Sequence, residues 1–244
     1  MNLIASMLCL GLIFFSCADK ALQPNTLSEQ ESGEGWSLLF DGKTTNGWHV
    51  YNEGNIPSVW SVRNGELTCD PAAKDVAFGD LVTDRSYQDF DLSFEWKISK
   101  GGNSGVFFNV QEDTANATAW TTGPEYQLYD NIHATDHNKN DPKRQAGCLY
   151  GLVALKNDAK TKPSGEWNLS RIEQVNGKVR FWLNGVQSAE ADLKSEQWKT
   201  LVDGSNLGKF PMFGKATSGK IALQNWAKGV SFRSIKIRDL AAKP

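Results

Sequence analysis

Residues 171–187 read RIEQVNGKVRFWLNGVQ, and this stretch is the best guide to the fold class. Within it Val179, Phe181 and Leu183 alternate with other residues at a period of two, which is typical of a strand with one buried face. Two Asn-Gly pairs interrupt the alternation, and such pairs favour type I′ hairpins because both central positions of that turn need positive φ. The stretch therefore predicts three consecutive antiparallel strands.

The same period of two recurs through the rest of the chain. Residues 90–98 alternate apolar and polar side chains, and a third Asn-Gly pair stands at 64–65 between two β-like runs. A last strand over residues 230–237 changes phase between Phe232 and Ile235, which predicts a β-bulge there. We find no window of helical length with a 3.6-residue period. We therefore predict an all-β, jelly-roll β-sandwich of two antiparallel sheets.

The composition excludes one class of partner. The 244 residues include 26 Lys and Arg against 28 Asp and Glu, a net charge of −2. Because no broad basic field or basic run exists, we do not expect the protein to bind nucleic acid. The 22 Gly and nine Trp indicate many turns and several flat apolar side chains.

The N-terminus predicts export. Residues 3–15 are an apolar run too short to span a bilayer, and the run ends at Ser16-Cys17, which resembles a bacterial lipobox. We expect a lipoprotein-type signal peptide over 1–16, a flexible linker over 17–35 after a lipidated Cys17, and a β-sandwich domain over 36–240. The protein would then lie in the periplasm or at the cell surface, with the lipid as its only membrane contact. An ordinary secretory signal, cleaved without lipid, is the alternative.

Two cysteines remain in the predicted domain. Cys69 and Cys148 could pair in an oxidising compartment, or both could be small buried side chains. No Cys-x-x-Cys spacing indicates a zinc site, and we expect no metal or other cofactor.

Residues 123–131, GPEYQLYDN, are the most informative for chemistry. On a strand Glu125 and Gln127 share a face, and a bulge before Asp130 would turn its carboxylate toward them. Two carboxyl groups in unlike environments can divide the roles of acid and base. The alternative is an exposed Glu followed by an Asp-Asn turn.

The polar segment over 133–150 supplies further candidates. His133 could act as a general base or bind a sugar hydroxyl, and a metal site with Asp136 and His137 is a weaker alternative. Arg144 could stabilise a developing enolate or bind a carbonyl oxygen, unless it is a surface ion-pair partner. We interpret Asn103-Ser104-Gly105 as a turn before a strand.

Tryptophan rings are candidates for stacking on sugars, because an indole has an apolar face and a polar edge. Most Trp side chains in a sandwich belong to the core, so we expect one or two on the ligand-facing side. The candidates are Trp120, Trp182, Trp198 and Trp226.

Six segments in order resemble the 3-keto-disaccharide hydrolase family, from Gly35 to about Leu240. They are GWSLLFDGKTTNGWHV, NSGVFF, GPEYQLYDN, AGCLYGL, FWLNGV and IALQNWAKGVSFRSIKIRDL. The resemblance implies a concanavalin A-like jelly roll, an exported or lipid-anchored protein, and action on glycosides oxidised at the 3-hydroxyl. Hydrolysis, elimination and hydration at C1–C2 all remain open. A non-catalytic carbohydrate-binding module on the cell surface is the alternative.

The resemblance also implies roles for individual residues. Glu125 would be the acid/base, with Asp130 and His133 as further catalytic groups. Substrate contacts would come from Gln127, Arg144, Tyr150, Gln224 and Trp226. One departure stands in the last segment, where the family often has Gln-Asp-His-Gly and this chain has Gln224-Asn225-Trp226-Ala227.

The lipid anchor leads to the first testable prediction. When the full-length chain is expressed in a bacterium that processes lipoproteins, Cys17→Ser should move the protein from the detergent phase to the aqueous phase of a phase separation. The thiol is the only acylation point in the lipobox-like segment. Ser16→Ala is the matched control, because it keeps a small residue before Cys17. Equal partitioning of wild type and Cys17→Ser would contradict the anchor.

Overall fold

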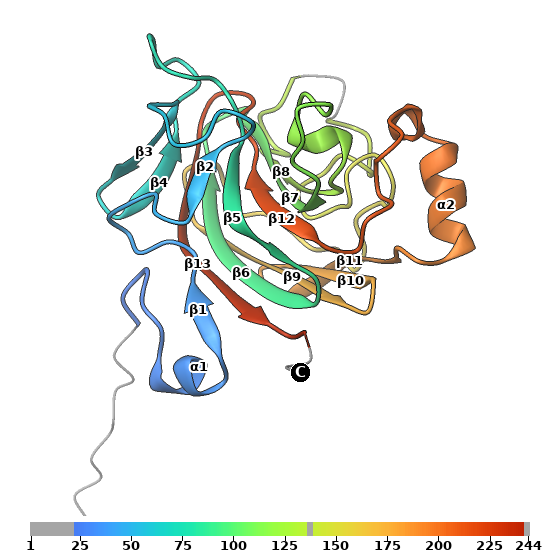
Figure 1. Cartoon of the computed structure of the whole chain (residues 1–244), viewed down its shortest axis with the longest axis horizontal. Helices are drawn as coiled ribbons and strands as arrows, with labels where there is room; N and C mark the ends of the chain where they lie inside the picture. The colour runs from blue at the N-terminus through green and yellow to red at the C-terminus, as the bar shows by residue number, and fades with distance from the viewer. Residues whose placement is uncertain (1–21, 136–138, 242–244) are drawn as a thin grey trace, which may run out of the picture.

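The computed structural model describes residues 22–135 and 139–241, which form two antiparallel β-sheets stacked face to face (Figure 1). The predicted all-β sandwich is therefore confirmed. The predicted signal peptide and the acylation point Cys17 lie outside the described residues. Within the described part of the chain, no helix is long and apolar enough to cross a membrane.

The longer sheet has eight strands, and β13 lies near its centre. Seven strands follow one another across it and β1 pairs with β13. In spatial order they are β11 (Val186–Asp192), β10 (Lys178–Leu183), β9 (Asn168–Val175), β6 (Phe90–Ile98), β13 (Val230–Asp239), β4 (Glu66–Cys69) and β3 (Trp60–Arg63), with β1 (Trp36–Leu38) beside β13.

The shorter sheet has five strands and lies across the longer one (Figure 1). In spatial order they are β2 (Trp48–Val50), β5 (Leu81–Tyr87), β12 (Gly219–Leu223), β7 (Asn103–Val110) and β8 (Glu125–Tyr129). The prediction of a turn at Asn103-Ser104-Gly105 is wrong, because these residues begin strand β7 and pair with β8.

The local turn signals are confirmed. Residues 168–192 form three consecutive antiparallel strands. The Asn-Gly pairs predicted to form hairpins, at 64–65, 176–177 and 184–185, have positive φ at both positions, for example 51° at Asn176 and 81° at Gly177. In β13 the register with β6 shifts between Arg233 and Lys236, with Ser234 at φ 51°. This is the bulge that the change of phase predicts.

Aromatic rings join the two sheets. The ring of Phe94 on β6 meets the ring of Tyr126 on β8 edge to face, with centroids 5.7 Å apart, and Tyr126 also lies 4.9 Å from the ring of Phe181 on β10. The buried hydroxyl of Tyr126 donates to the carbonyl of Trp182 at 3.0 Å and lies 2.8 Å from the hydroxyl of Ser170. These contacts fix the position of β8, which is the strand that carries Glu125.

Two short helices lie outside the sheets, and the expectation of no helical window is wrong for one of them. Helix α2 (Glu196–Asp203) has a Ser195 cap whose hydroxyl accepts from the backbone N–H of Trp198, and it buries Trp198 and Val202. A helix of eight residues is too short for its period to stand out in the sequence. Two 3₁₀ turns, η1 (Ala119–Thr121) and η2 (Asn206–Lys209), complete the described elements.

The flexible linker predicted for 17–35 is wrong from Asn25 onward. Helix α1 (Glu29–Gly33) begins with a capping box formed by Ser28 and Glu31, and Glu31 forms an ion pair with Lys236 of β13. Asn25 donates to the carbonyl of Gly65 at 2.8 Å and accepts from the backbone of Ser234 at 2.8 Å. Polar contacts rather than an apolar stripe hold this segment, so hydrophobic periodicity does not reveal it.

The two domain cysteines are free and buried. Of the two alternatives, the structure therefore supports small buried side chains. Burial raises the pKa of Cys69 to about 12, so its thiol stays protonated. Its Sγ lies 3.3 Å from the side-chain oxygen of Asn225.

Phe94→Ala should lower the free energy of unfolding by about 3–5 kcal/mol, because it removes a fully packed ring between the two sheets. Chemical denaturation at fixed pH measures this change. Leu169→Ala on the adjacent strand β9 is the control, since Leu169 is 49% exposed and its truncation should change stability by less than about 0.5 kcal/mol. Similar losses in the two variants would show that the sheets do not depend on this ring.

Candidate functional site

Strand β8 is an edge strand whose outer side is covered. The backbone N–H of Gly147 donates to the carbonyl of Gln127 at 2.9 Å, and that of Tyr150 donates to the carbonyl of Glu125 at 3.0 Å. Because the segment over 146–150 satisfies the open side of β8, all five residues of the strand are buried. The same pairing brings Tyr150 beside Glu125.

A pocket of about 320 Å³ opens over β7 and β8. Most of its wall is aromatic or apolar, and its polar side chains are an acid, two amides and a phenol. It is lined by Asn103, Phe107, Trp120, Gly123, Glu125, Tyr150, Leu207, Phe213, Gln224 and Trp226. A mostly apolar hollow with a few polar groups is the usual form of a small-molecule site.

Glu125 lies across the backbone of β7 at Gly105. A Cβ atom built on Gly105 would stand only 2.0 Å from Oε1 of Glu125, so any larger residue there would displace the carboxyl. Gly105 accepts a 2.9 Å hydrogen bond from the backbone N–H of Gln224, which brings the end of β12 to the same place. The glycine therefore provides the space that the acid occupies.

Burial raises the pKa of Glu125 well above its ordinary value, and the negative charge of Asp80 raises it further. No hydrogen bond from the described residues offsets these two effects. Removal from water and a neighbouring negative charge both favour the protonated form of a carboxyl group, which can then donate its proton.

Asp80 is a functional candidate that the sequence did not reveal. It precedes β5, and its carboxylate accepts from the backbone N–H of Asn225 at 2.9 Å, between the pocket residues Gln224 and Trp226. Burial raises the pKa of Asp80 to about 6, although hydrogen bonds from the backbones of Asn225 and Ala119 lower it in part. No local motif marks this residue, because strand pairing alone brings it to the site.

The two glutamines differ in position. Gln224 lines the pocket, whereas Gln127 is fully buried behind it and donates to the carbonyl of Arg144 at 3.2 Å. Among the described residues, the side-chain oxygens of both glutamines are buried without a hydrogen-bond partner. A buried acceptor without a donor is costly, so the oxygen of Gln224 can gain a partner when a ligand hydroxyl enters the pocket.

Asp130 does not turn into this pocket, so the predicted convergence with Glu125 and Gln127 is wrong. Its carboxylate accepts from the backbone N–H groups of Gly101, Ile132 and His133, at 2.7, 3.1 and 3.2 Å, and lies 3.0 Å from the ring of His133. Burial would raise the pKa of Asp130, but these hydrogen bonds lower it. Asp130 therefore organises the turn after β8.

His133 lies in that same turn and does not line the pocket. The metal alternative also involved Asp136 and His137, which lie outside the described residues. In residues 22–135 and 139–241 we find no group of three or more His, Cys, Asp or Glu side chains placed to hold a metal ion.

Arg144 lies in a second hollow that adjoins the pocket. Trp120, Tyr150 and Leu207 line both spaces, so the two hollows are neighbours. The guanidinium of Arg144 lies 5.5 Å from the centroid of the Tyr150 ring and 3.1 Å from the carboxylate of Asp141.

Two of the candidate tryptophans reach the pocket. Trp226 is 58% exposed and lines the pocket, and Trp120 also lines it, with its ring packed edge to face on Phe210. Trp198 is buried, and the ring of Trp182 contacts the guanidinium of Arg171 on the longer sheet. Of the eight residues predicted to act on substrate, Glu125, Tyr150, Gln224 and Trp226 therefore share one pocket.

Residues 35–238 match the family described as a 3-keto-alpha-glucoside-1,2-lyase-like domain, and the chain belongs to this family. The family resemblance seen in the sequence is thus confirmed over nearly the whole predicted domain.

The chain is also similar to a curated protein in sequence and to solved structures in fold. A 3-keto-disaccharide hydrolase of Bacteroides thetaiotaomicron is 32% identical over 252 residues, which cover 93% of this chain and 86% of that protein. A solved Parabacteroides distasonis protein, described as a candidate glycosyl hydrolase, is 33% identical with a TM-score of 0.82, over 89% of this chain and all of that one. The Bacillus subtilis carbohydrate-binding module CBM66 shares the fold at 11% identity and a TM-score of 0.50, over 79% and 95% of the two chains. The fold is a concanavalin A-like jelly roll.

Asp80→Asn should lower the pKa of Glu125, because it removes the negative charge that adds to the effect of burial. The value should stay above the ordinary one, since burial is the larger cause. A ¹³C-carboxyl NMR titration of the Glu-labelled protein, assigned with Glu125→Gln, measures the shift. Asp75→Asn, at an exposed position five residues earlier in the chain, is the control. An unchanged midpoint in Asp80→Asn would contradict the coupling.

Proposed function

We propose that the protein cleaves glycosides whose sugar carries a carbonyl at C3, with Glu125 as the acid/base. The observation that carries this proposal is the placement of Glu125, a buried carboxyl with a raised pKa in an aromatic pocket. The family and the hydrolase relative support the substrate class.

The carbonyl of the substrate means that the protein needs to supply only proton transfer, and no nucleophile. A carbonyl at C3 acidifies the proton on C2, so that the C1 substituent can leave by β-elimination without a strong nucleophile. A neutral Glu125 can donate its hydroxyl proton to the departing oxygen while its other oxygen accepts the proton from C2. The carboxyl then ends the step in the state in which it began. Addition of water across the C1–C2 double bond completes a net hydrolysis.

The wall of the pocket suits a sugar ring. Trp226 and Trp120 offer apolar faces for C–H groups, and Gln224 and Asn103 offer amides for hydroxyls. The adjoining hollow beyond Tyr150 gives space for the second sugar of a disaccharide, with Arg144 in reach of its hydroxyls. The pocket therefore binds the oxidised sugar and the hollow binds the leaving group.

The last segment also shapes the site. This chain has Asn225 and Trp226 where the family resemblance implies an acid and an imidazole. Asn225 is buried beside Asp80, and Trp226 supplies a ring surface in place of an imidazole. We propose further that Cys17 anchors the exported domain to a membrane, so that it meets glycans outside the cytoplasm.

Glu125→Gln should lower kcat on a 3-keto-disaccharide by about 10²–10⁴ while leaving affinity for the substrate unchanged, because the amide fits the same space but cannot transfer the proton. NMR in D₂O follows both the release of monosaccharide and the entry of deuterium at C2. The exposed Glu53 gives the matched control, Glu53→Gln.

The unoxidised parent disaccharide completes the experiment, since without a C3 carbonyl it should not be cleaved. Unchanged turnover in Glu125→Gln would remove the assignment of Glu125. Binding of both sugars by the wild type without any release would favour the carbohydrate-binding module over the enzyme.

A further inference from the structure

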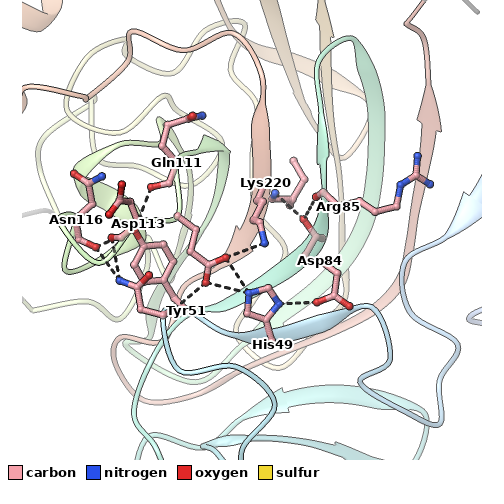
Figure 2. A network of polar contacts seen from close by, with 12 residues as sticks. His49, Tyr51, Asp84, Arg85, Gln111, Asp113, Asn116 and Lys220 are labelled. Atoms are coloured by element: carbon pink, nitrogen blue, oxygen red, sulfur yellow. Dashed lines mark hydrogen bonds and ion pairs between the residues drawn. The ribbon is translucent and has the colours of Figure 1, made fainter.

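A histidine of the shorter sheet lies between two carboxylates (Figure 2). Nδ1 of His49 on β2 lies 2.6 Å from Oδ1 of Asp84 on β5, and its Nε2 lies 2.9 Å from Oε2 of Glu112, which follows β7. Lys220 of β12 forms a 2.8 Å ion pair with Glu112. His49 and Glu112 are each only 14% exposed, whereas Asp84 is 51% exposed.

Only the doubly protonated ring can satisfy both contacts. A neutral imidazole has one N–H group, so one carboxylate would then face a ring nitrogen lone pair at a hydrogen-bond distance. Asp84 is the partner that can turn to water, because it is 51% exposed, whereas Glu112 is 14% exposed and also pairs with Lys220. Loss of the proton therefore weakens the bridge from β5 through His49 to Glu112.

The same region holds the segment that follows β7. The hydroxyl of Tyr51 donates to the carbonyl of Asn116 at 3.0 Å (Figure 2). The side chain of Asn52 donates to the same carbonyl at 3.1 Å. The backbone N–H of Asn52 donates to Glu112 at 2.8 Å. Tyr51 and Asn52, which follow β2, therefore form hydrogen bonds to both ends of the segment over 112–116.

This segment leads directly to the pocket wall. Three residues beyond Asn116 the chain enters η1, where Ala119 packs in a small buried cluster with Tyr51 and Phe107, and Trp120 packs against that cluster. Phe107 and Trp120 both line the pocket. The His49 contacts and the aromatic wall therefore belong to one continuous set of packed residues.

We propose that His49 is a positioning residue: its protonated ring fixes the segment over 112–116 and thereby holds Trp120 against the pocket. Binding of the sugar ring then weakens as the pH rises and the ring loses its proton. The inference rests on the proposed function only in so far as Trp120 contacts the sugar. The charged groups that face His49 are Asp84 and Glu112, with Lys220 behind Glu112.

The test compares the wild type at about pH 6 and about pH 8.5, on either side of the usual imidazole range. Hydrogen exchange of residues 111–121, corrected for the intrinsic effect of pH, should be slower at the lower pH. KM for a 3-keto-disaccharide should rise about three- to tenfold at the higher pH, as expected if only a tenth to a third of molecules keep the wall in place. The pH dependence of kcat reports Glu125 separately.

His49→Gln and Glu112→Gln should each show fast exchange of 111–121 and a raised KM at both pH values, with kcat within about twofold of wild type at each pH. Glu66→Gln is the matched control, since it removes a 2.7 Å ion pair with Lys97 on the other sheet. It should change neither readout.

The hydrogen-exchange and KM results together decide the role of His49. Exchange of 111–121 that is independent of pH and of His49→Gln would overturn the inference. Faster exchange without a change in KM would also overturn it, because the segment would then be held without serving the pocket, while the proposed function would stand. If the wild type cleaves no 3-keto-disaccharide, the proposed function fails. In that case the exchange results, with the affinity for the same sugar at the two pH values, still decide the inference.

Discussion

The carboxyl of Glu125 lies against the bare backbone of Gly105, away from water and without a hydrogen bond from the described residues. This contact sets the chemistry of the site, because removal from water favours the neutral acid and the nearby charge of Asp80 favours it further. The rest of the site follows from it. Aromatic side chains keep the surroundings apolar, and the two hollows let a sugar approach the acid from the open side.

The jelly roll serves this contact by bringing distant parts of the sequence to one end of the shorter sheet. Glu125 comes from β8, Gly105 from β7, Gln224 from the end of β12, and Asp80 from the start of β5. The β7–β8 register sets Glu125 opposite Phe107 and Gln127 opposite Gly105. The ring contacts of Tyr126 anchor the same strand from the core side. A shift of one residue in this register would move the acid to the opposite face.

The sequence predicts strands and turns, which depend on neighbouring residues. It does not predict side-chain positions that depend on contacts between distant segments of the chain. Alternation and Asn-Gly turns predict the strands over 168–192, and the period of two places Glu125 and Gln127 on one face. The direction of Asp130 depends on a backbone N–H from Gly101, nearly 30 residues earlier in the chain, so the strand pattern cannot predict it. Asp80 has no local signal, because β5 and β12 must pair before it meets Asn225. The family resemblance indicated the acid and the substrate class but not the carboxyl partner.

We infer that Glu125 is a neutral acid in the resting protein, and its protonation state can be measured without substrate. Infrared difference spectra of wild type against Glu125→Gln near neutral pH separate a protonated carboxyl from a carboxylate, and ¹³C labelling of glutamate confirms the assignment. A protonated-acid band should be present in the wild type and lost in the variant. A carboxylate band at Glu125 under these conditions would contradict it.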